Sequence, residues 1–598
     1  MSSYLGLLTS NLYHKFKNFF LFIPYVSRIR HQASGITRSI SRSVPPLLLV
    51  ACYLVPLAFL LVFYFYPLTS IFKLSFASEG QLNLMALEKL VTSSYYAKTL
   101  WFTVWQATLS TVLTLGAALP AAYVFARYRF PGKSLLQALT TIPFVLPTIV
   151  VANAFGALLG PRGTLNAWLM TLLQLDTPPI RLQHTIWIIL LAHVFYNYTI
   201  VLRLVGGFWA NLNSKLSEAG QMLGASSWRT FWQITFPLLA PVITAAALLV
   251  FIFCFTSFGV ILILGGPRFA TLEVEIYQQA VHLFNLPVAA ALSLIQIVFI
   301  FILMMTYTRL QARTSRPLNL QSQQSIQRSP QSWRERLLVW GNVSLMAILL
   351  GAPLIALGLR SVTVAGRLSP TYYQALVSDI SKNRSLFFVP PSEAIGNSLT
   401  FAGGTVALAA LLGLLIAIAL GRGTAAKTSK FDTIFMLPLA TSAVTLGFGY
   451  IITMNKPPLN LRTSPLLIVI AHTLVALPFV VRSLLPALRS IQPALREAAS
   501  ILGASPGRVW REVDLPIASR ALLVGAVFAF TISMGEFGAT VFIARPDTPT
   551  MPTAIFRFFS QPGALNYGQA LAMSTLLMLV CVIGFVAIER FRIGNGEF

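Results

Sequence analysis

Two stretches of this sequence repeat each other, "LSEAGQMLGASSWRTFWQITFPLLAP" at 216–241 and "LREAASILGASPGRVWREVDLPIASR" at 495–520. They share one register at an offset of 279 residues. The same offset continues on both sides of the stretches, where it aligns Ala192 and His193 with Ala471 and His472, Phe258 and Gly259 with Phe537 and Gly538, and Ala291 and Leu292 with Ala570 and Leu571. An internal repeat on this scale means that the chain folds as two related halves.

Composition places both halves in a membrane. The chain has 598 residues, of which 56% are hydrophobic and 10% charged, whereas about 25% are charged in soluble proteins. A span needs about 20 apolar residues, and a helix satisfies its own backbone in lipid. We therefore predict an all-α polytopic membrane protein with about twelve transmembrane helices, approximately at 47–67, 101–126, 135–159, 186–208, 239–264, 287–308, 337–359, 399–420, 432–452, 466–485, 517–543 and 569–588.

The net charge of +26 raises the alternative of nucleic-acid binding, but the placement of the charges argues against it. If the N-terminus lies inside, the inner loops carry 29 of the 43 Lys and Arg residues. This asymmetry is the positive-inside rule, and it predicts that the N- and C-termini both lie in the cytoplasm. Anionic headgroups of the lipid bilayer are the expected partners of the surplus charge, and no nucleic acid is expected.

The repeat and the spans together predict the domain organisation. Residues 1–44 form a basic cytoplasmic segment, and the apolar run after it is too long for a signal-peptide core. Residues 45–308 form the first repeat of six helices, 309–336 a cytoplasmic linker rich in Gln, Ser and Arg, and 337–598 the second repeat. Because six is an even number, both halves start inside and the repeats are parallel.

The repeated stretch is an inner loop between the fourth and fifth spans of each half. Apolar residues recur there at helical spacing, which predicts one short amphipathic helix in each copy. Gly224 and Gly503 stand where a helix end favours a left-handed residue. Pro237 and Pro516 stand where we expect the next membrane helix to begin.

Both loops resemble the EAA signature of binding-protein-dependent ABC importer permeases of type I. The matching residues are Glu218, Ala219, Gly224, Ile234 and Pro237 in the first loop, and Glu497, Ala498, Ala499, Gly503, Val513, Leu515 and Pro516 in the second. The first loop departs from the signature at Gly220, in place of Ala, and at Phe236, in place of Leu. The resemblance implies that each loop is a coupling helix that sits in a cleft of a separate ATP-binding subunit.

The energy for transport must then come from a separate ATP-binding subunit, because this chain has no phosphate-binding loop. The nearest string, "RFPGKS" at 129–134, lacks the leading glycine of that motif. We expect no enzymatic activity and no bound cofactor in this chain. The resemblance implies two copies of an ABC ATP-binding subunit and an extracytoplasmic solute-binding protein as partners.

Polar residues inside predicted spans are the candidates for a cargo pathway. Glu536 is the one acidic residue well inside a span, and its counterpart in the first half is Ser257. Glu536 either lines the pathway or serves helix packing. Asn153 and Asn197 are further candidates.

Metal binding is not predicted. His193 and His472 occupy equivalent positions but lack Cys or carboxylate neighbours in the local sequence. All three cysteines, Cys52, Cys254 and Cys581, fall inside predicted spans, where buried thiols are ordinary.

Two questions stay open at this level. Fused twelve-span chains of this kind resemble the ferric iron and thiamine importer permeases, so the cargo is predicted to be one of these or a similar small solute. The alternative class is a secondary transporter of the major facilitator type, which also has two parallel six-helix repeats. That family carries a charged signature between its second and third spans, and "RYRFPGK" at 127–133 has no acidic residue.

Overall fold

The computed structural model describes residues 46–78, 81–82, 84–212, 214–314, 327–364, 366–377, 390–421, 425–455, 457 and 459–593. The expected basic segment 1–44 and residues 315–326 of the expected linker lie outside the described residues. Helices make up nearly all of the described chain, and the two short hairpins contain only two residues in each strand.

The first half contains α2 (Pro46–Leu60), a π-helical turn (Leu61–Phe65), α3 (Tyr66–Phe76), β1 (Ala77–Ser78), β2 (Gln81–Leu82), α4 (Met85–Thr92), α5 (Ser94–Arg127), α6 (Lys133–Leu139), α7 (Ile142–Val145), α8 (Thr148–Leu159), α9 (Thr164–Leu173), α10 (Ile186–Ala210), α11 (Ser214–Met222), α12 (Ser227–Thr230), a π-helical turn (Phe231–Thr235), α13 (Phe236–Phe255), α14 (Gly259–Leu264), a 3-10 turn (Gly266–Arg268), α15 (Leu272–Tyr277), a π-helical turn (Gln278–His282) and α16 (Leu286–Thr314).

The second half contains α17 (Trp333–Ser361), β3 (Thr363–Val364), β4 (Arg367–Leu368), α18 (Thr371–Val377), α19 (Pro391–Gly421), α20 (Ala425–Met436), a 3-10 turn (Leu437–Ala440), α21 (Ala443–Thr453), α22 (Leu466–Ser490), α23 (Pro493–Ile501), α24 (Pro506–Val509), a π-helical turn (Trp510–Asp514), α25 (Leu515–Gly535), α26 (Thr540–Ile543), α27 (Met551–Phe559) and α28 (Ala564–Ile593).

Among the described residues, ten helices are long and apolar enough to cross a membrane, and two bent helix pairs raise the number to twelve if each pair is one span. The bent pairs are the third predicted span of each half. Lys133–Val145 and Thr148–Leu173 meet at 106°, and Phe431–Ala440 and Ala443–Thr453 meet at 94°. The third predicted span of each half is therefore bent and not one straight helix.

Local chemistry explains these breaks. Pro147 lacks an N–H and restricts the preceding residue, and Leu146 is accordingly extended (φ −69°, ψ 142°). In the second half Ser442 is the N-cap of α21 and accepts a hydrogen bond from the Val444 N–H at 3.1 Å. The fifth spans, expected to be continuous, are also interrupted, between α13 and α14 and between α25 and α26. The four interruptions thus form two pairs, each at equivalent positions of the two halves.

The first span of each half packs against the other half. In the first half, α2 and α3 contact α19 and α21, and the Tyr53 hydroxyl donates to the Ala419 carbonyl at 2.6 Å. The Tyr450 hydroxyl returns a hydrogen bond to the Phe63 carbonyl at 2.9 Å. In the second half, α17 lies against α8 and α5. One large cluster of buried apolar side chains runs through both halves, so they share a core.

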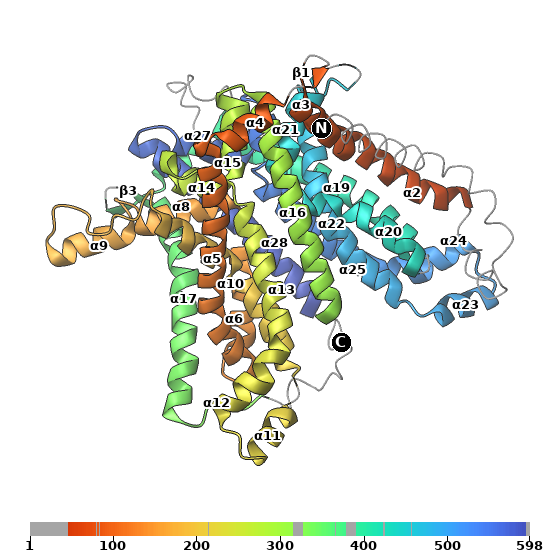
Figure 1. Ribbon diagram of the computed structural model, residues 1–598, viewed down its shortest axis with the longest axis horizontal. Coiled ribbons are helices and arrows are strands. Elements are labelled where there is room, and N and C mark those ends of the chain that lie inside the picture. The colour runs from red at the N-terminus through yellow and green to blue at the C-terminus, as the bar shows by residue number, and fades with distance from the viewer. Residues whose placement is uncertain are drawn as a thin grey trace.

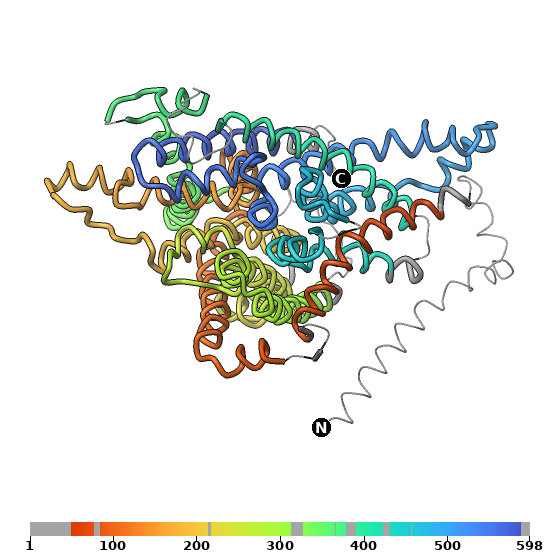
Figure 2. The backbone as a smooth tube through the Cα atoms, turned by 90° about the horizontal axis from the view of Figure 1, so that it is seen from above, coloured from red at the N-terminus to blue at the C-terminus, as the bar shows by residue number. Residues whose placement is uncertain are grey.

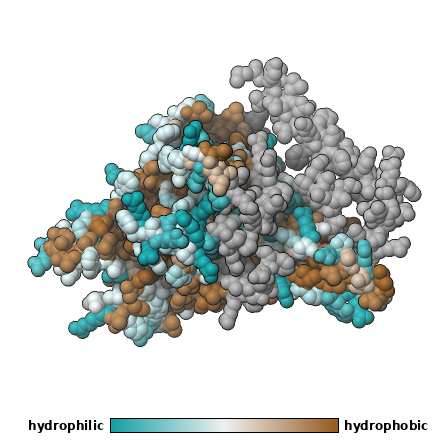
Figure 3. Space-filling model, turned by 90° about the horizontal axis from the view of Figure 1, so that it is seen from below, coloured by the Kyte–Doolittle hydropathy of each residue, from teal (hydrophilic) through white to brown (hydrophobic). Residues whose placement is uncertain are grey.

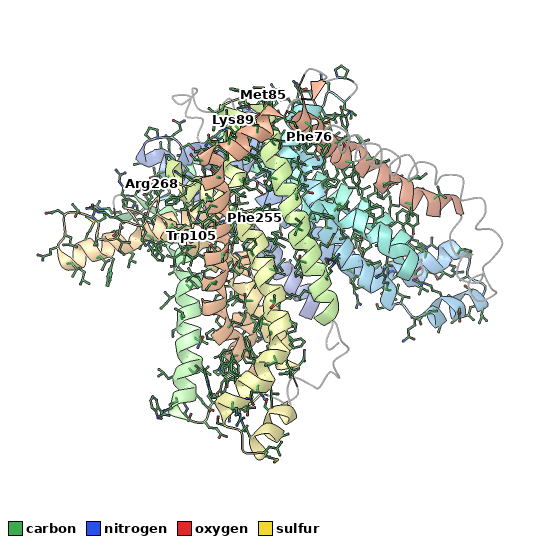
Figure 4. The ribbon with its side chains drawn as sticks, viewed as in Figure 1. Phe76, Met85, Lys89, Trp105, Phe255 and Arg268 are labelled. Atoms are coloured by element: carbon green, nitrogen blue, oxygen red, sulfur yellow. The ribbon has the colours of Figure 1, made fainter. Side chains whose placement is uncertain are left out.

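The halves diverge toward their loop-bearing ends. In Figure 1, α5, α10, α13 and α17 run side by side, while α19, α22 and α25 run obliquely to them, and α11 and α23 lie far apart. Figure 2 shows α9 and the α23–α24 segment at opposite edges of the molecule. Met85, Lys89 and Arg268 lie at the end of the bundle away from α11 (Figure 4). Loops predicted to lie on opposite sides of the membrane thus occupy different ends of the first half.

Candidate functional site

The first repeated loop forms a helix with a tightly closed C-terminus. Helix α11 ends at Met222, and Gly224 follows with a left-handed backbone (φ 86°). The Gly224 N–H donates to the Gln221 carbonyl at 2.9 Å, and the Ala225 N–H donates to the Gly220 carbonyl at 3.1 Å. This pair of bonds is a Schellman motif, which satisfies carbonyls that the helix end would otherwise leave free.

The second loop has the same geometry, residue for residue. Helix α23 ends at Ile501, and Gly503 is left-handed (φ 83°). Its N–H donates to the Ser500 carbonyl at 3.0 Å, and the Ala504 N–H donates to the Ala499 carbonyl at 3.0 Å. Both glycines thus have the left-handed backbone that their sequence positions predict.

Each Schellman turn presents a pair of apolar side chains to the outside. Met222 and Leu223 are each 90% exposed, and Ile501 and Leu502 are 86% and 87% exposed. Hydrophobic side chains gather at the end of the molecule that α23 and α24 form (Figure 3). Glu218 and Glu497 are also exposed, as are Ala219, Ala498, Pro237 and Pro516. These two matched surfaces expose apolar area that a monomeric soluble surface would normally bury.

The loops are held to the helix that follows them. A Cβ on Gly220 would lie 2.8 Å from Ile234 Cδ1, so an alanine at this position would require the end of the Ile234 side chain to shift. The equivalent residues of the second loop are Ala499 and Val513. Ala499 is one methyl group larger than Gly220, and Val513 is one carbon smaller than Ile234. Glycine in place of Ala at position 220 is thus matched by the larger Ile234.

A polar contact reinforces this attachment. In the second loop, Arg496 Nε lies 2.7 Å from Oδ1 of the buried residue Asp514. The equivalent pair in the first loop is Ser217 and Thr235, whose hydroxyl oxygens are 3.4 Å apart. Each loop is thus attached to the π-helical turn that precedes α13 or α25.

Pro237 and Pro516 lie in the first turn of α13 and of α25, as the sequence predicts, but each of these helices continues directly from a helical segment before it. A continuous helical run from Ser227 to Phe255 contains Pro237, with a π-helical turn directly before it. The same turn precedes Pro516 in the second half. Because proline has no N–H for the usual bond and its ring crowds the preceding turn, the helical run widens into a π-helical turn just before each proline.

A second candidate site lies between the halves, where the interrupted helices meet. A cavity of about 410 Å³ is lined by both halves, and its walls include the breaks at Leu146–Pro147 and Thr441–Ser442. The breaks after α13 and α25 also line it, through Ser257 and Glu536. Interrupted helices in corresponding positions of two repeats are typical of cargo sites in transporters.

The two halves meet in this cavity through an aromatic pair. Phe258 and Phe537, which are equivalent in the repeat, stack with their ring centroids 5.6 Å apart and an interplanar angle of 25°. The glycine after Phe258 permits a close approach, since a Cβ on Gly259 would lie 2.3 Å from Thr148 Oγ1. The start of α8 thus packs directly on the break in the fifth span.

The equivalent histidines are held by hydroxyl groups. His193 Nδ1 lies 2.9 Å from Ser110 Oγ, and its Nε2 lies 2.9 Å from Ser257 Oγ. His472 Nδ1 lies 2.7 Å from Ser533 Oγ, and its Nε2 lies 2.8 Å from Thr540 Oγ1. Both rings are buried and have a partner on each nitrogen. Within the described part of the chain, no three His, Cys, Asp or Glu side chains gather as a metal site would require.

The candidate Glu536 lines the cavity and is firmly positioned. Its carboxylate accepts hydrogen bonds from the N–H groups of Ala539 at 2.8 Å and Thr540 at 3.0 Å, and from the Thr540 hydroxyl. His472 Nε2 lies 3.4 Å from Glu536 Oε2. In the first half the counterpart Ser257 contacts His193 instead, so the acid and the hydroxyl play the same positional role.

The structure places the two asparagine candidates, Asn197 and Asn153, in different environments. Asn197 lines the cavity and donates to the His193 carbonyl at 2.9 Å. Asn153 is buried outside the cavity wall and donates to Ser574 Oγ at 2.8 Å, which joins the two halves. The structure thus groups Glu536, Ser257 and Asn197 and leaves Asn153 in a packing contact.

Glu273 is a cavity residue that the sequence reasoning missed. It lies in α15, within a stretch expected to be an outward loop, and its side chain is completely buried in the cavity wall. Ser442 Oγ donates to Glu273 Oε2 at 2.8 Å, across the two halves, and Gln296 Nε2 donates to Oε1. The spacing of "TLEVEIYQQA" at 271–280 with its two acids was the available signal.

The chain is similar in sequence to a family of membrane transport proteins along most of its length. A family model described as "Binding-protein-dependent transport system inner membrane component" matches residues 114–316 and again 348–592. The chain is 28% identical over 499 residues to the thiamine transport system permease protein ThiP of Brucella abortus (strain 2308), covering 83% of this chain and 88% of the relative.

Two further relatives have the same printed name. The protein of Haemophilus influenzae (strain ATCC 51907 / DSM 11121 / KW20 / Rd) is 27% identical over 552 residues, covering 90% of this chain and 95% of the relative. That of Escherichia coli (strain K12) is 26% identical over 509 residues, covering 83% and 89%. The similarity to these relatives extends through both halves.

Proposed function

The chain belongs to the family of binding-protein-dependent transport system inner membrane components, and from this premise we propose that its two loops dock two ATP-binding subunits and that its central cavity carries thiamine or a close chemical relative. It is a fused, two-domain permease of an ABC importer and a multi-pass inner membrane protein. Importers of this family work with an ATPase and a solute-binding protein.

The coupling role is supported by one observation above all, the identical construction of the two loops. Each ends in a Schellman turn that exposes two large apolar side chains next to a glutamate, and each is fastened to the base of the fifth span. Two equal docking surfaces call for two equal partners. A partner that draws α11 and α23 together would rotate the diverging halves and change access to the cavity.

The thiamine proposal is supported by the similarity to thiamine transport system permease proteins and by the chemistry of the cavity. The relatives in three organisms are called thiamine permeases. Stacked aromatic rings and buried carboxylates suit a flat, cationic molecule better than a bare ferric ion, which requires a cluster of charged ligands.

Uptake of radiolabelled thiamine tests this proposal. The chain is produced with its ATPase and solute-binding protein in a bacterial strain that lacks its own thiamine permease, and uptake is compared with that of labelled ferric iron. We expect thiamine uptake that requires ATP. Iron uptake without thiamine uptake would refute the cargo.

Docking is tested by co-purification. The double substitution Glu218→Lys and Glu497→Lys is expected to lose the ATPase while the permease still inserts in the membrane. Retention of the ATPase by this double variant at the wild-type level would refute docking through the two loops.

The orientation and domain limits belong to the same proposal. Both termini, the linker 309–336 and both coupling loops face the cytoplasm, and residues 45–308 and 337–598 are the two permease units. Labelling of single cysteines introduced at Met222 and at Trp168 in intact cells is expected to reach only position 168. Labelling at position 222 alone would invert the topology.

A further inference from the structure

We propose that the central cavity binds its cargo as a monovalent organic cation and that the buried carboxylate of Glu273 supplies the counter-charge. This inference rests on the proposed function, because it names the charge anchor of the same cavity. It goes further in assigning a residue and a class of ligand, aromatic organic cations, to that site.

The first step is the electrostatic situation of Glu273. Its side chain has no exposed surface, and its two hydrogen-bond donors, Ser442 and Gln296, are both neutral. Among the residues that the structure describes, Glu273 forms no ion pair with Lys, Arg or His. Burying a carboxylate without a counter-charge is costly, and an acid inside a transporter is by default a functional residue.

The second step separates Glu273 from the other buried acids. Glu536 already has two backbone N–H donors, a hydroxyl and His472 at 3.4 Å. Glu275 lies two residues beyond Glu273 in α15, accepts from the Tyr95 hydroxyl and the Gln279 amide, and does not line the cavity. Glu273 is therefore the carboxylate in the cavity wall that lacks a charged partner, and a ligand gains access to it when its contact with Ser442 opens.

The third step concerns the shape of the ligand. The stacked rings of Phe258 and Phe537 belong to the cavity wall, and Phe144, Phe253 and Phe479 also line it. Aromatic faces attract cations and stack on flat rings. A volume of about 410 Å³ is in the range of pockets for small organic molecules.

The fourth step concerns the position of Glu273 in the transport cycle. Its bond to Ser442 connects α15 of the first half to the break before α21 in the second half. Divergence or approach of the halves must change this contact. The strength of the cation site is therefore coupled to the conformation that the ATPase imposes, which allows release after binding.

Direct binding to the purified full chain in lipid nanodiscs tests the inference. Isothermal titration calorimetry is carried out with thiamine, with the 3-benzylthiazolium cation, and with neutral 4-amino-5-hydroxymethyl-2-methylpyrimidine. We expect wild type to bind both cations at least about tenfold more tightly than the neutral pyrimidine. Glu273→Gln should weaken both cations by about tenfold or more and leave the pyrimidine unchanged.

Matched variants separate charge from structure. Glu275→Gln removes a similarly buried carboxylate of the same helix outside the cavity, and it should bind all three probes as wild type does. Glu273→Asp keeps the charge and should retain the preference for cations. Should Glu273→Gln fail to fold, the preference of wild type for cations over the neutral pyrimidine remains a decisive measurement.

Two results would overturn the inference: wild type without saturable binding of either cation, or a Glu273→Gln variant with unchanged cation affinity. Thiamine uptake together with unchanged affinity in the variant would refute the anchor and leave the proposed cargo intact. Absent thiamine uptake together with Glu273-dependent thiazolium binding would refute the cargo and leave the cation site intact.

Discussion

Replacing the apolar pair Met222 and Leu223 with serines should release one ATP-binding subunit without disturbing the fold. Both side chains are 90% exposed, so the permease itself loses almost no buried apolar area, and its stability should stay within about 0.5 kcal/mol of wild type. The free energy of docking of the ATP-binding subunit should change much more. Burying such a side chain contributes about 1.5–3 kcal/mol, so two of them contribute at least about 3 kcal/mol to docking, or a factor of about 100 in affinity.

The measurement is the affinity of the ATPase subunit for the permease in nanodiscs, by surface plasmon resonance. The Met222→Ser/Leu223→Ser variant should show half of the wild-type binding capacity at the wild-type affinity, because the loop at Ile501 and Leu502 is untouched. Adding Ile501→Ser and Leu502→Ser should remove the remaining tight binding.

A matched control comes from the opposite end of the molecule. Leu172 and Leu173 in α9 are also exposed, and Leu172→Ser/Leu173→Ser removes similar apolar area far from the loops. The reasoning is refuted if the loop variant binds the ATPase at full capacity, or if the control loses binding to the same extent.

Three further predictions concern stability, each read as the thermal unfolding midpoint of the purified chain. Gly220→Ala should raise stability by less than the about 1 kcal/mol that this change usually gains inside a helix, because Ile234 Cδ1, 2.8 Å from the new methyl, must move aside; Ile234→Val in the same chain should recover the difference, and additive effects would contradict the packing argument. Asp514→Asn should reduce stability by about 1–3 kcal/mol through loss of the Arg496 pair, and an unchanged midpoint would show that the pair contributes nothing. His472→Ala should destabilise more than the same change at its first-half counterpart, because it also strips a partner from a buried carboxylate; equal losses would argue against that role.

The sequence alone was sufficient wherever the determining interactions are local. Hydrophobic length predicts the helices, and the repeat register predicts which residues are equivalent. The left-handed glycines at 224 and 503 follow from helix-end chemistry within five residues. The two inner loops could therefore be recognised as a matched pair from their residues alone.

Interruptions of the spans were harder to predict, since hydropathy averages over about 20 residues and does not register a break of two or three. Pro147 was a visible signal, but prolines also occur inside continuous helices of this chain, such as Pro120 and Pro353. A continuous hydrophobic run thus concealed the corners at which the cavity forms.

Only the tertiary structure decided what lies in the cavity. Glu273 and Ser442 are 169 residues apart, and Phe258 and Phe537 belong to different halves, so no local pattern indicates either contact. A six-residue helix such as α15 is too short to be assigned from periodicity, and its acids looked like part of a solvated loop. Long-range packing buries Glu273 against the neutral side chains of Ser442 and Gln296, and this burial is what distinguishes it from an ordinary acidic residue of a loop.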